Sequence, residues 1–186
     1  MLATAYRKPT REEMTAINRA LGRWGAYEAL KDSTFLVKNG KPKIICIVSP
    51  ALKEWAINLQ PYAAGLEIGE LGKQFAPTVA GASLFARLGK KSRIYVQVGD
   101  NAEMLVLYGR DVMGDSIVEA VQDLDENELV IMTNQKGEAI GIGRTRFAGK
   151  SLFQKGRITI TTLADAGRYL RDEDESRTKM IMSRQR

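Results

Sequence analysis

Histidine is absent from the 186-residue sequence, and cysteine occurs once, as Cys46. Without histidine, the Ser/His and Cys/His pairs that activate a catalytic nucleophile cannot form. One cysteine can make no internal disulfide and supplies no multi-thiolate zinc site, so we expect no metal centre. Because all its neighbours in the run 44–48 are apolar, we predict that Cys46 is a buried thiol; a reactive nucleophile is the alternative.

Long apolar runs are also missing. No run approaches the roughly 20 residues that a membrane span requires, and the N-terminal segment lacks the apolar core of a signal peptide. We therefore expect a soluble, cytoplasmic protein.

Glycine-rich phosphate loops are incomplete in this sequence. Gly69 and Gly72 are not followed by the Gly-Lys-Ser/Thr of a P-loop. Gly141 and Gly143 precede Arg146, which stands where a dinucleotide fingerprint requires glycine. We therefore expect no cofactor and no enzymatic activity, although Asp and Glu are spread widely enough to leave a carboxylate mechanism open.

The distribution of charge indicates an acidic partner. Lys and Arg total 28 and Asp and Glu total 22, giving a net charge of +6, which favours nucleic acid as a partner. Residues 1–92 carry 14 basic and 7 acidic residues (+7), and residues 93–170 carry 9 and 11 (−2). Five of those nine basic residues fall within fourteen positions: Arg144, Arg146, Lys150, Lys155 and Arg157.

Two interpretations of this basic segment are open. It is either a solvated, charged strand end, as most runs of like charge are, or a cationic edge that holds a phosphate backbone. Phe153 lies between Lys150 and Lys155 and is a candidate for stacking on a nucleic-acid base.

The first half of the sequence predicts helices packed on an antiparallel sheet. Thr10 and Glu13 have capping-box spacing ahead of an apolar helical stripe that ends at Trp24. Asn39-Gly40 separates two β-rich runs, and Ser49-Pro50 begins a second helix. The buried face predicted for that helix is Leu52, Trp55, Ala56 and Leu59. Residues 66–75 predict one strand bent at its glycines, and residues 79–88 predict a short helix.

The second half predicts a small mixed β-barrel. Strands are expected at residues 93–98, 116–121, 129–132, 139–147 and 157–161. Helices are expected at residues 101–108 and 163–171, capped by Asp100 and Thr162 respectively. Gly141 and Gly143 alternate with isoleucines, which indicates a tight bend or a close backbone approach on the glycine side. The predicted domains are residues 1–91 and 92–171, followed by a disordered tail at 172–186.

Motifs in both halves resemble those of one family and occur in the same order. Residues 102–112 and 139–143 are similar to the helix, glycine loop and late strand of PUA domains, which are RNA-binding barrels of pseudouridine synthases and archaeosine transglycosylases. The other motifs are Thr10-Arg-Glu-Glu, Ile47-Val48-Ser49, Ala56-Ile57-Asn58-Leu59, Gly72-Lys73-Gln74-Phe75 and the run 164–171. The ordered set, over about residues 9–173, resembles the archaeal form of the Nip-seven family of large-ribosomal-subunit biogenesis factors. Residues 76–91 and the tail after 175 depart from the pattern.

The resemblance implies an α+β fold, with an N-terminal α+β domain containing an antiparallel sheet and a C-terminal PUA mixed β pseudo-barrel. It further implies a non-enzymatic factor that binds single-stranded or U-rich RNA during pre-rRNA processing, with the exosome and other biogenesis factors as partners. The family's RNA contacts match Arg144, Arg146, Lys150 and Lys155, with Arg157 adjacent. The alternative is a PUA accessory or interaction module of an RNA-modification system that makes pseudouridine or archaeosine.

Overall fold

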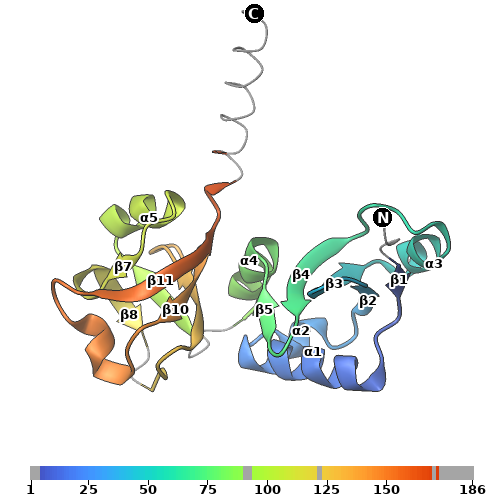
Figure 1. The fold of residues 1–186 in the computed structure, drawn as a ribbon, viewed down its shortest axis with the longest axis horizontal. Coiled ribbons are helices and arrows are strands. Elements are labelled where there is room, and N and C mark those ends of the chain that lie inside the picture. The colour runs from blue at the N-terminus through green and yellow to red at the C-terminus, as the bar shows by residue number, and fades with distance from the viewer. Residues whose placement is uncertain (1–4, 90–93, 121–122, 169–170, 172–186) are drawn as a thin grey trace, which may run out of the picture. The chain divides into compact units, whose positions relative to one another are not determined.

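The computed structural model describes residues 5–89, 94–120, 123–168 and 171. The chain forms two compact units, unit 1 (Met1–Ile94) and unit 2 (Tyr95–Arg186), each built on its own sheet (Figure 1). The predicted boundary between residues 91 and 92 and the predicted tail at 172–186 lie outside the described residues.

Unit 1 contains a five-stranded antiparallel sheet in the order β1-β2-β3-β4-β5. Its strands are β1 (Tyr6–Arg7), β2 (Thr34–Lys38), β3 (Lys43–Val48), β4 (Leu66–Leu71) and β5 (Phe75–Pro77). Its helices are α1 (Arg11–Arg23), α2 (Tyr27–Leu30), α3 (Pro50–Leu59) and α4 (Val79–Leu88). The segment predicted as one bent strand is therefore the hairpin β4–β5, because the chain turns at Gly72, whose N–H bonds to the Gln74 carbonyl.

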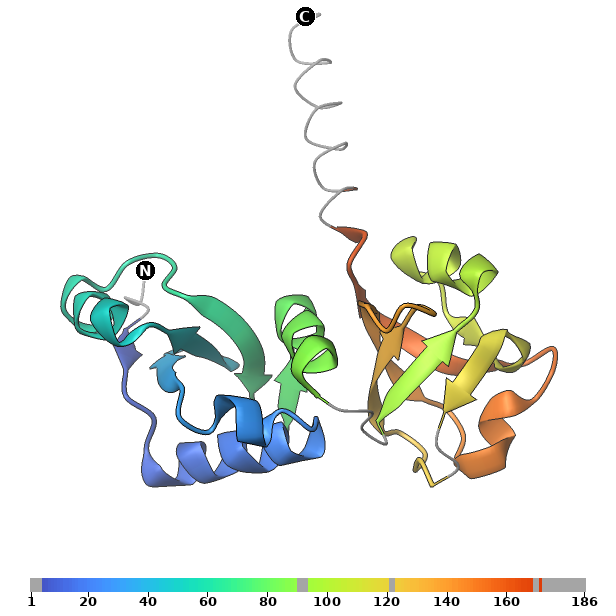
Figure 2. The ribbon, with the colours of Figure 1, turned by 180° about the vertical axis from the view of Figure 1, so that it is seen from behind.

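Helices α1 and α4 belong to one core of unit 1. The predicted capping box at the start of α1 is confirmed: Thr10 Oγ1 accepts from the Glu13 N–H, and a Glu13 carboxylate oxygen accepts from the Thr10 N–H. At the other end of α1, Trp24 is buried, and its ring stacks on that of Phe85 from α4, with centroids 6.5 Å apart. Both views show α1 running along the sheet (Figure 1 and Figure 2).

Helix α3 covers a second cluster, in which Tyr6, Leu36, Cys46 and Ala56 are buried together. The burial of Cys46 agrees with the sequence prediction. The predicted buried face of α3 is wrong, however. Of its four members only Ala56 is buried; the other three are exposed, namely Leu52 by 37%, Trp55 by 64% and Leu59 by 67%. Helical spacing identified an apolar stripe, but α3 instead turns the small Ala56 toward the sheet.

Unit 2 contains a six-stranded mixed sheet in the order β7-β11-β10-β9-β6-β8; among its described strands, β6 and β9 pair in parallel and the other neighbours pair antiparallel. Its strands are β6 (Tyr95–Val98), β7 (Val112–Met113), β8 (Ile117–Ala120), β9 (Leu129–Thr133), β10 (Ala139–Thr145) and β11 (Ile158–Asp165). Its helices are α5 (Asp100–Leu107) and the 3₁₀ turns η1 (Gly114–Ser116) and η2 (Gly149–Phe153). Together with unit 1, this architecture confirms the predicted α+β fold class and the mixed β pseudo-barrel.

The predicted close approach at the glycines of β10 is confirmed. A Cβ on Gly141 would lie 2.8 Å from the Ala164 carbonyl oxygen, and one on Gly143 would lie 2.4 Å from the Ile160 side chain. Side chains at these positions would push β11 away, so the glycines allow β10 and β11 to pair along their length.

The same pairing overturns the first part of the helix predicted at residues 163–171, whereas Arg168 and Arg171, near its predicted end, are helical. Ala164 and Asp165 pair with Ile142 and Gly141, so β11 continues to Asp165. Thr162 therefore lies within a strand and caps no helix. The helical pattern was local, whereas β11 gains its hydrogen bonds from β10, far away in the sequence. Asp100 also differs from its predicted role, because it is the first residue of α5 and Gly99 is the N-cap.

Candidate nucleic-acid interface

The five clustered cations lie on one continuous hairpin, β10–η2–β11. We call Arg144, Arg146, Lys150, Lys155 and Arg157 the basic edge. Arg144 is the next-to-last residue of β10, and Arg146 follows its last residue, Thr145. The two lysines lie in or just after η2, and Arg157 immediately precedes β11.

The backbone of the basic edge is held in place by close packing. Leu152, in the middle of η2, is fully buried. The Gly149 N–H donates to the Leu124 carbonyl, 2.9 Å away. A Cβ on Gly114 would lie 2.4 Å from the Gln154 carbonyl oxygen, so only glycine lets η1 approach the end of η2 this closely. The loop that carries the lysines is therefore anchored at both ends.

Arg146 is oriented by two partners on neighbouring segments. Its Nη2 donates to Asp111 Oδ2 at 2.8 Å, and its Nε donates to Thr161 Oγ1 at 2.7 Å. Asp111 Oδ1 accepts from the Thr162 N–H at 2.9 Å, so the carboxylate is itself fixed by β11. Arg146 remains exposed, but a carboxylate compensates its charge.

Within the described residues, Arg144 and Arg157 make hydrogen bonds to neutral acceptors. Arg144 Nη1 donates to the Asn127 carbonyl at 2.9 Å. Arg157 Nη1 donates to Gln154 Oε1 at 2.9 Å, and its guanidinium lies 4.9 Å from the centre of the Phe147 ring. A guanidinium has five N–H donors, so both retain free donors, and no carboxylate among the described residues pairs with either charge.

Lys150 and Lys155 are exposed, and neither has a hydrogen bond or ion pair within the described residues. Phe153, between them, is half-buried. The edge thus contains one ion-paired cation and four without an acidic partner in the described chain. Because Lys and Arg side chains only donate hydrogen bonds, this surface is suited to binding anions.

Two contributors were not found from the sequence. Asp111 lies in a motif used for the resemblance, but nothing local indicates that it reaches Arg146, which is 35 residues away. Phe147 appeared to be a core residue, whereas the structure shows its half-buried ring beneath Arg157. An aromatic residue close to a cluster of cations is the feature that could have indicated this second role.

The described residues contain no group of three or more His, Cys, Asp or Glu side chains placed to hold a metal ion. In the same part of the chain, every helix is too short or too polar to cross a membrane.

Comparison with known proteins defines the class of the molecule. The family model described as "NIP7/UPF0113, pre-PUA domain" matches residues 6–79, and the "UPF0113 PUA domain" matches residues 94–174. A conserved PUA domain protein from Thermoplasma acidophilum has the same fold, with a TM-score of 0.65, 16% identity, and coverage of 88% of this chain and 95% of that one. A hypothetical protein from Pyrococcus horikoshii also has a TM-score of 0.65, with 20% identity over 87% of this chain and 94% of the other. The molecule is thus a two-unit protein with a C-terminal PUA domain.

A UPF0113 protein of Archaeoglobus fulgidus is 34% identical over 171 residues, which is 91% of this chain and 96% of the relative. The chain belongs to the NIP7/UPF0113 family. This confirms the resemblance predicted from the ordered motifs.

Proposed function

We propose that this protein is a non-enzymatic RNA-binding factor in ribosome biogenesis, acting on precursors of large-subunit ribosomal RNA. The observation that carries the proposal is the charge balance of the basic edge, where four of five cations lack an acidic partner in the described chain. Membership of the NIP7/UPF0113 family and the resemblance to the Nip-seven factors support ribosomal RNA as the ligand.

The arrangement supports two kinds of contact with single-stranded or U-rich RNA. Lys150 and Lys155 are exposed ammonium groups on an anchored loop, and they act as point charges toward phosphate. Arg144 and Arg146 are held at the end of β10, where a planar guanidinium can hydrogen-bond a base edge or stack on a base. Phe153 and Arg157 complete the surface, as a stacking ring and a further phosphate contact.

The double substitution Lys150→Ala with Lys155→Ala tests this proposal. For single strands the log–log dependence of affinity on salt has a slope of about −0.7 per phosphate contact, so the three contacts of Lys150, Lys155 and Arg157 give about −2. For the double variant this slope is expected to be shallower by about 1.4, and the affinity is expected to fall by a similar factor for every RNA sequence. Lys136→Ala, which removes an exposed cation from the β9–β10 turn of the same unit, is the matched control.

An unchanged affinity and an unchanged slope, in a variant with native thermal unfolding, would show that the basic edge is only a solvated face. The alternative function would then take its place: a PUA accessory or interaction module of an RNA-modification system. Turnover of an RNA substrate by the isolated chain would contradict the non-enzymatic assignment.

Protein partners are part of the proposal, with the exosome and other biogenesis factors as candidates. The apolar stripe of α3 supports it, because exposed Trp55 and Leu59 lie four residues apart on one helix face. Exposed apolar patches of this kind mark protein-interaction sites. We expect Trp55→Ala with Leu59→Ala to weaken binding to purified exosome subunits while leaving RNA affinity unchanged; equal binding by the variant would exclude α3 as the contact.

A further inference from the structure

A groove of about 460 Å³ lies in unit 1, between α1 and the turn that joins β4 to β5. Four cations line it, and we call it the unit 1 groove. They are Arg19 and Arg23 from α1, Lys43 from β3 and Lys73 from the β4–β5 turn. None of these residues belongs to the basic edge. They lie within residues 1–92, which carry a net charge of +7 of their own.

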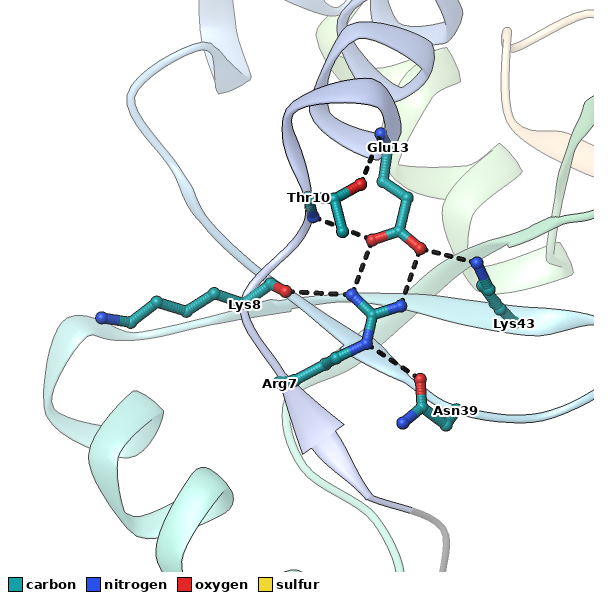
Figure 3. A network of polar contacts seen from close by, with 6 residues as sticks. All are labelled: Arg7, Lys8, Thr10, Glu13, Asn39 and Lys43. Carbon is teal, nitrogen blue, oxygen red and sulfur yellow. Dashed lines mark hydrogen bonds and ion pairs between the residues drawn. The ribbon is translucent and has the colours of Figure 1, made fainter.

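The cations of the groove converge from three elements. Arg19 and Arg23 are four residues apart, so they project from the same face of α1. Lys43 is positioned by Glu13, since its Nζ lies 2.8 Å from Glu13 Oε1. Figure 3 shows the Glu13 carboxylate between Lys43 and the guanidinium of Arg7, which binds both carboxylate oxygens at 2.7 Å.

This network leaves the groove with an excess of positive charge. Two carboxylates line it, Glu12 and Glu13, against four cations. Glu13 is already paired with Arg7, which does not line the groove, so it only partly offsets Lys43. Arg19 and Lys73 are exposed and have no hydrogen bond or ion pair within the described residues. Their donors are therefore available to an anion.

The groove also presents apolar side chains, which narrows the choice of anion. Ala16, Leu71 and Phe75 line it and are partly exposed, whereas Trp24, which also borders it, is buried. An inorganic ion gains nothing from such apolar surface. A single-stranded nucleic acid matches both features, because its phosphates bind cations while its bases contact apolar and aromatic surface.

We propose that the unit 1 groove is a second RNA-binding site, which takes the phosphate backbone of single-stranded RNA outside the PUA unit. The inference rests on the proposed function only in taking RNA as the ligand. The site extends the contact with RNA from one unit to both, so the affinity for long RNA gains from the two contacts acting together.

The test uses the full-length chain with Arg19→Ala and Lys73→Ala, which we call the groove variant. Its matched control is Lys8→Ala with Arg11→Ala, which also removes one lysine and one arginine from exposed positions of unit 1 outside the groove. Figure 3 shows the Lys8 ammonium pointing away from Glu13 and Lys43. Affinity is measured by fluorescence anisotropy over a salt series, with single-stranded RNAs of about 10 and about 30 nucleotides, which bracket common site sizes.

For the longer RNA the groove variant is expected to lose affinity at least about fivefold and to have a slope shallower by about 1.4, as two phosphate contacts require. The control should match the unaltered protein. A photoreactive 4-thiouridine RNA should also cross-link to residues 11–24 or 71–75 of the unaltered chain, a readout that does not depend on how any variant folds.

Unchanged affinity and slope, with no cross-link in these segments, would overturn the inference and leave the groove to another class of anion. The variant with Lys150→Ala and Lys155→Ala is measured in parallel and separates the two proposals. If it binds like the unaltered protein while the groove variant does not, the basic edge fails and the groove stands; the reverse result leaves the basic edge as the sole site.

Discussion

Asp111 and Arg146 are 35 residues apart in the sequence, yet Asp111 Oδ2 accepts a hydrogen bond from Arg146 Nη2 at 2.8 Å. The other carboxylate oxygen of Asp111 accepts from the backbone N–H of Thr162. One side chain therefore ties the segment after α5 to the end of β10 and the middle of β11. It also gives Arg146 a fixed direction at the surface.

We expect Asp111→Asn to affect stability and RNA binding in opposite directions. The amide keeps the shape but loses the charge, so the free energy of unfolding should fall by about 1 kcal/mol, as measured by urea denaturation. Arg146 loses its compensating charge, so the salt slope for RNA should become steeper by up to about 0.7. Asp115→Asn, an exposed control in η1, should change neither; an unaltered unfolding midpoint for Asp111→Asn would contradict this role.

Glu13 makes the stability of unit 1 sensitive to acid. Hydrogen bonds from Arg7, Lys43 and the Thr10 N–H hold the pKa of Glu13 well below its usual range. Because the folded-state pKa is lowered, the stabilisation is fully present above the unfolded value of about 4.3 and is lost as the pH falls below it.

Glu13→Gln should therefore lower the free energy of unfolding by about 2 kcal/mol at pH 7, and the difference from the unaltered protein should shrink below about pH 4. Denaturant unfolding at a series of pH values measures both effects. Glu12→Gln removes a neighbouring exposed carboxylate and serves as the control. A difference that stays constant down to pH 2 would show that Glu13 acts through packing alone.

Cys46 should be inert in the native protein. It is fully buried, and burial, reinforced by the negative charge of Glu67, raises the pKa of the Cys46 thiol to about 11. The thiolate is the reactive form, so a disulfide reagent at pH 8 should modify native protein more than about a hundredfold more slowly than protein in denaturant. Rapid modification of the native state, with loss of RNA binding, would instead support the reactive-nucleophile alternative.

Residues 93–171 expressed alone should fold and keep most of the RNA affinity for short strands, because unit 2 has its own sheet and core. The fragment must include Arg171, whose guanidinium binds both carboxylate oxygens of the buried Asp165, at 3.0 and 2.9 Å. Circular dichroism and anisotropy measure folding and binding. A fragment that folds but does not bind would place the RNA site in unit 1.

Within that unit, Arg171→Ala leaves Asp165 without this partner in a buried position. We expect it to lower the free energy of unfolding by about 2–3 kcal/mol, toward the lower end for a broken buried pair because Arg171 is partly exposed. Arg110→Ala removes an exposed arginine from the same unit and should have little effect on thermal unfolding.

Local sequence patterns correctly predicted the features that nearby residues determine. The capping box of Thr10 and Glu13 defined the start of α1, and Gly141 with Gly143 indicated the close approach that the structure shows. The predictions failed where partners far away in the sequence decide the outcome. Leu163–Asp165 form a strand because β10 supplies hydrogen bonds, and Trp55 is exposed because α3 presents Ala56 to the sheet.

The basic edge shows the same division. The five cations were found from their clustering, but their different roles depend on Asp111, Thr161 and Gln154, which the local pattern does not connect to them. The spacing of residues in the sequence does not show which cation forms an ion pair, because strand pairing determines which carboxylate lies next to it.

The contrast between tethered arginines and free lysines on the basic edge has a consequence for the thermodynamics of binding. Immobilising a long cationic side chain costs up to about 2 kcal/mol in rotamer entropy. Arg146 and Arg157 are already restrained in the folded protein, whereas Lys150 and Lys155 lose their freedom only when a ligand arrives. We therefore expect the lysines' contribution to the binding free energy to fall more with rising temperature than that of the arginines. The restrained arginines, in turn, hold the ligand in one position.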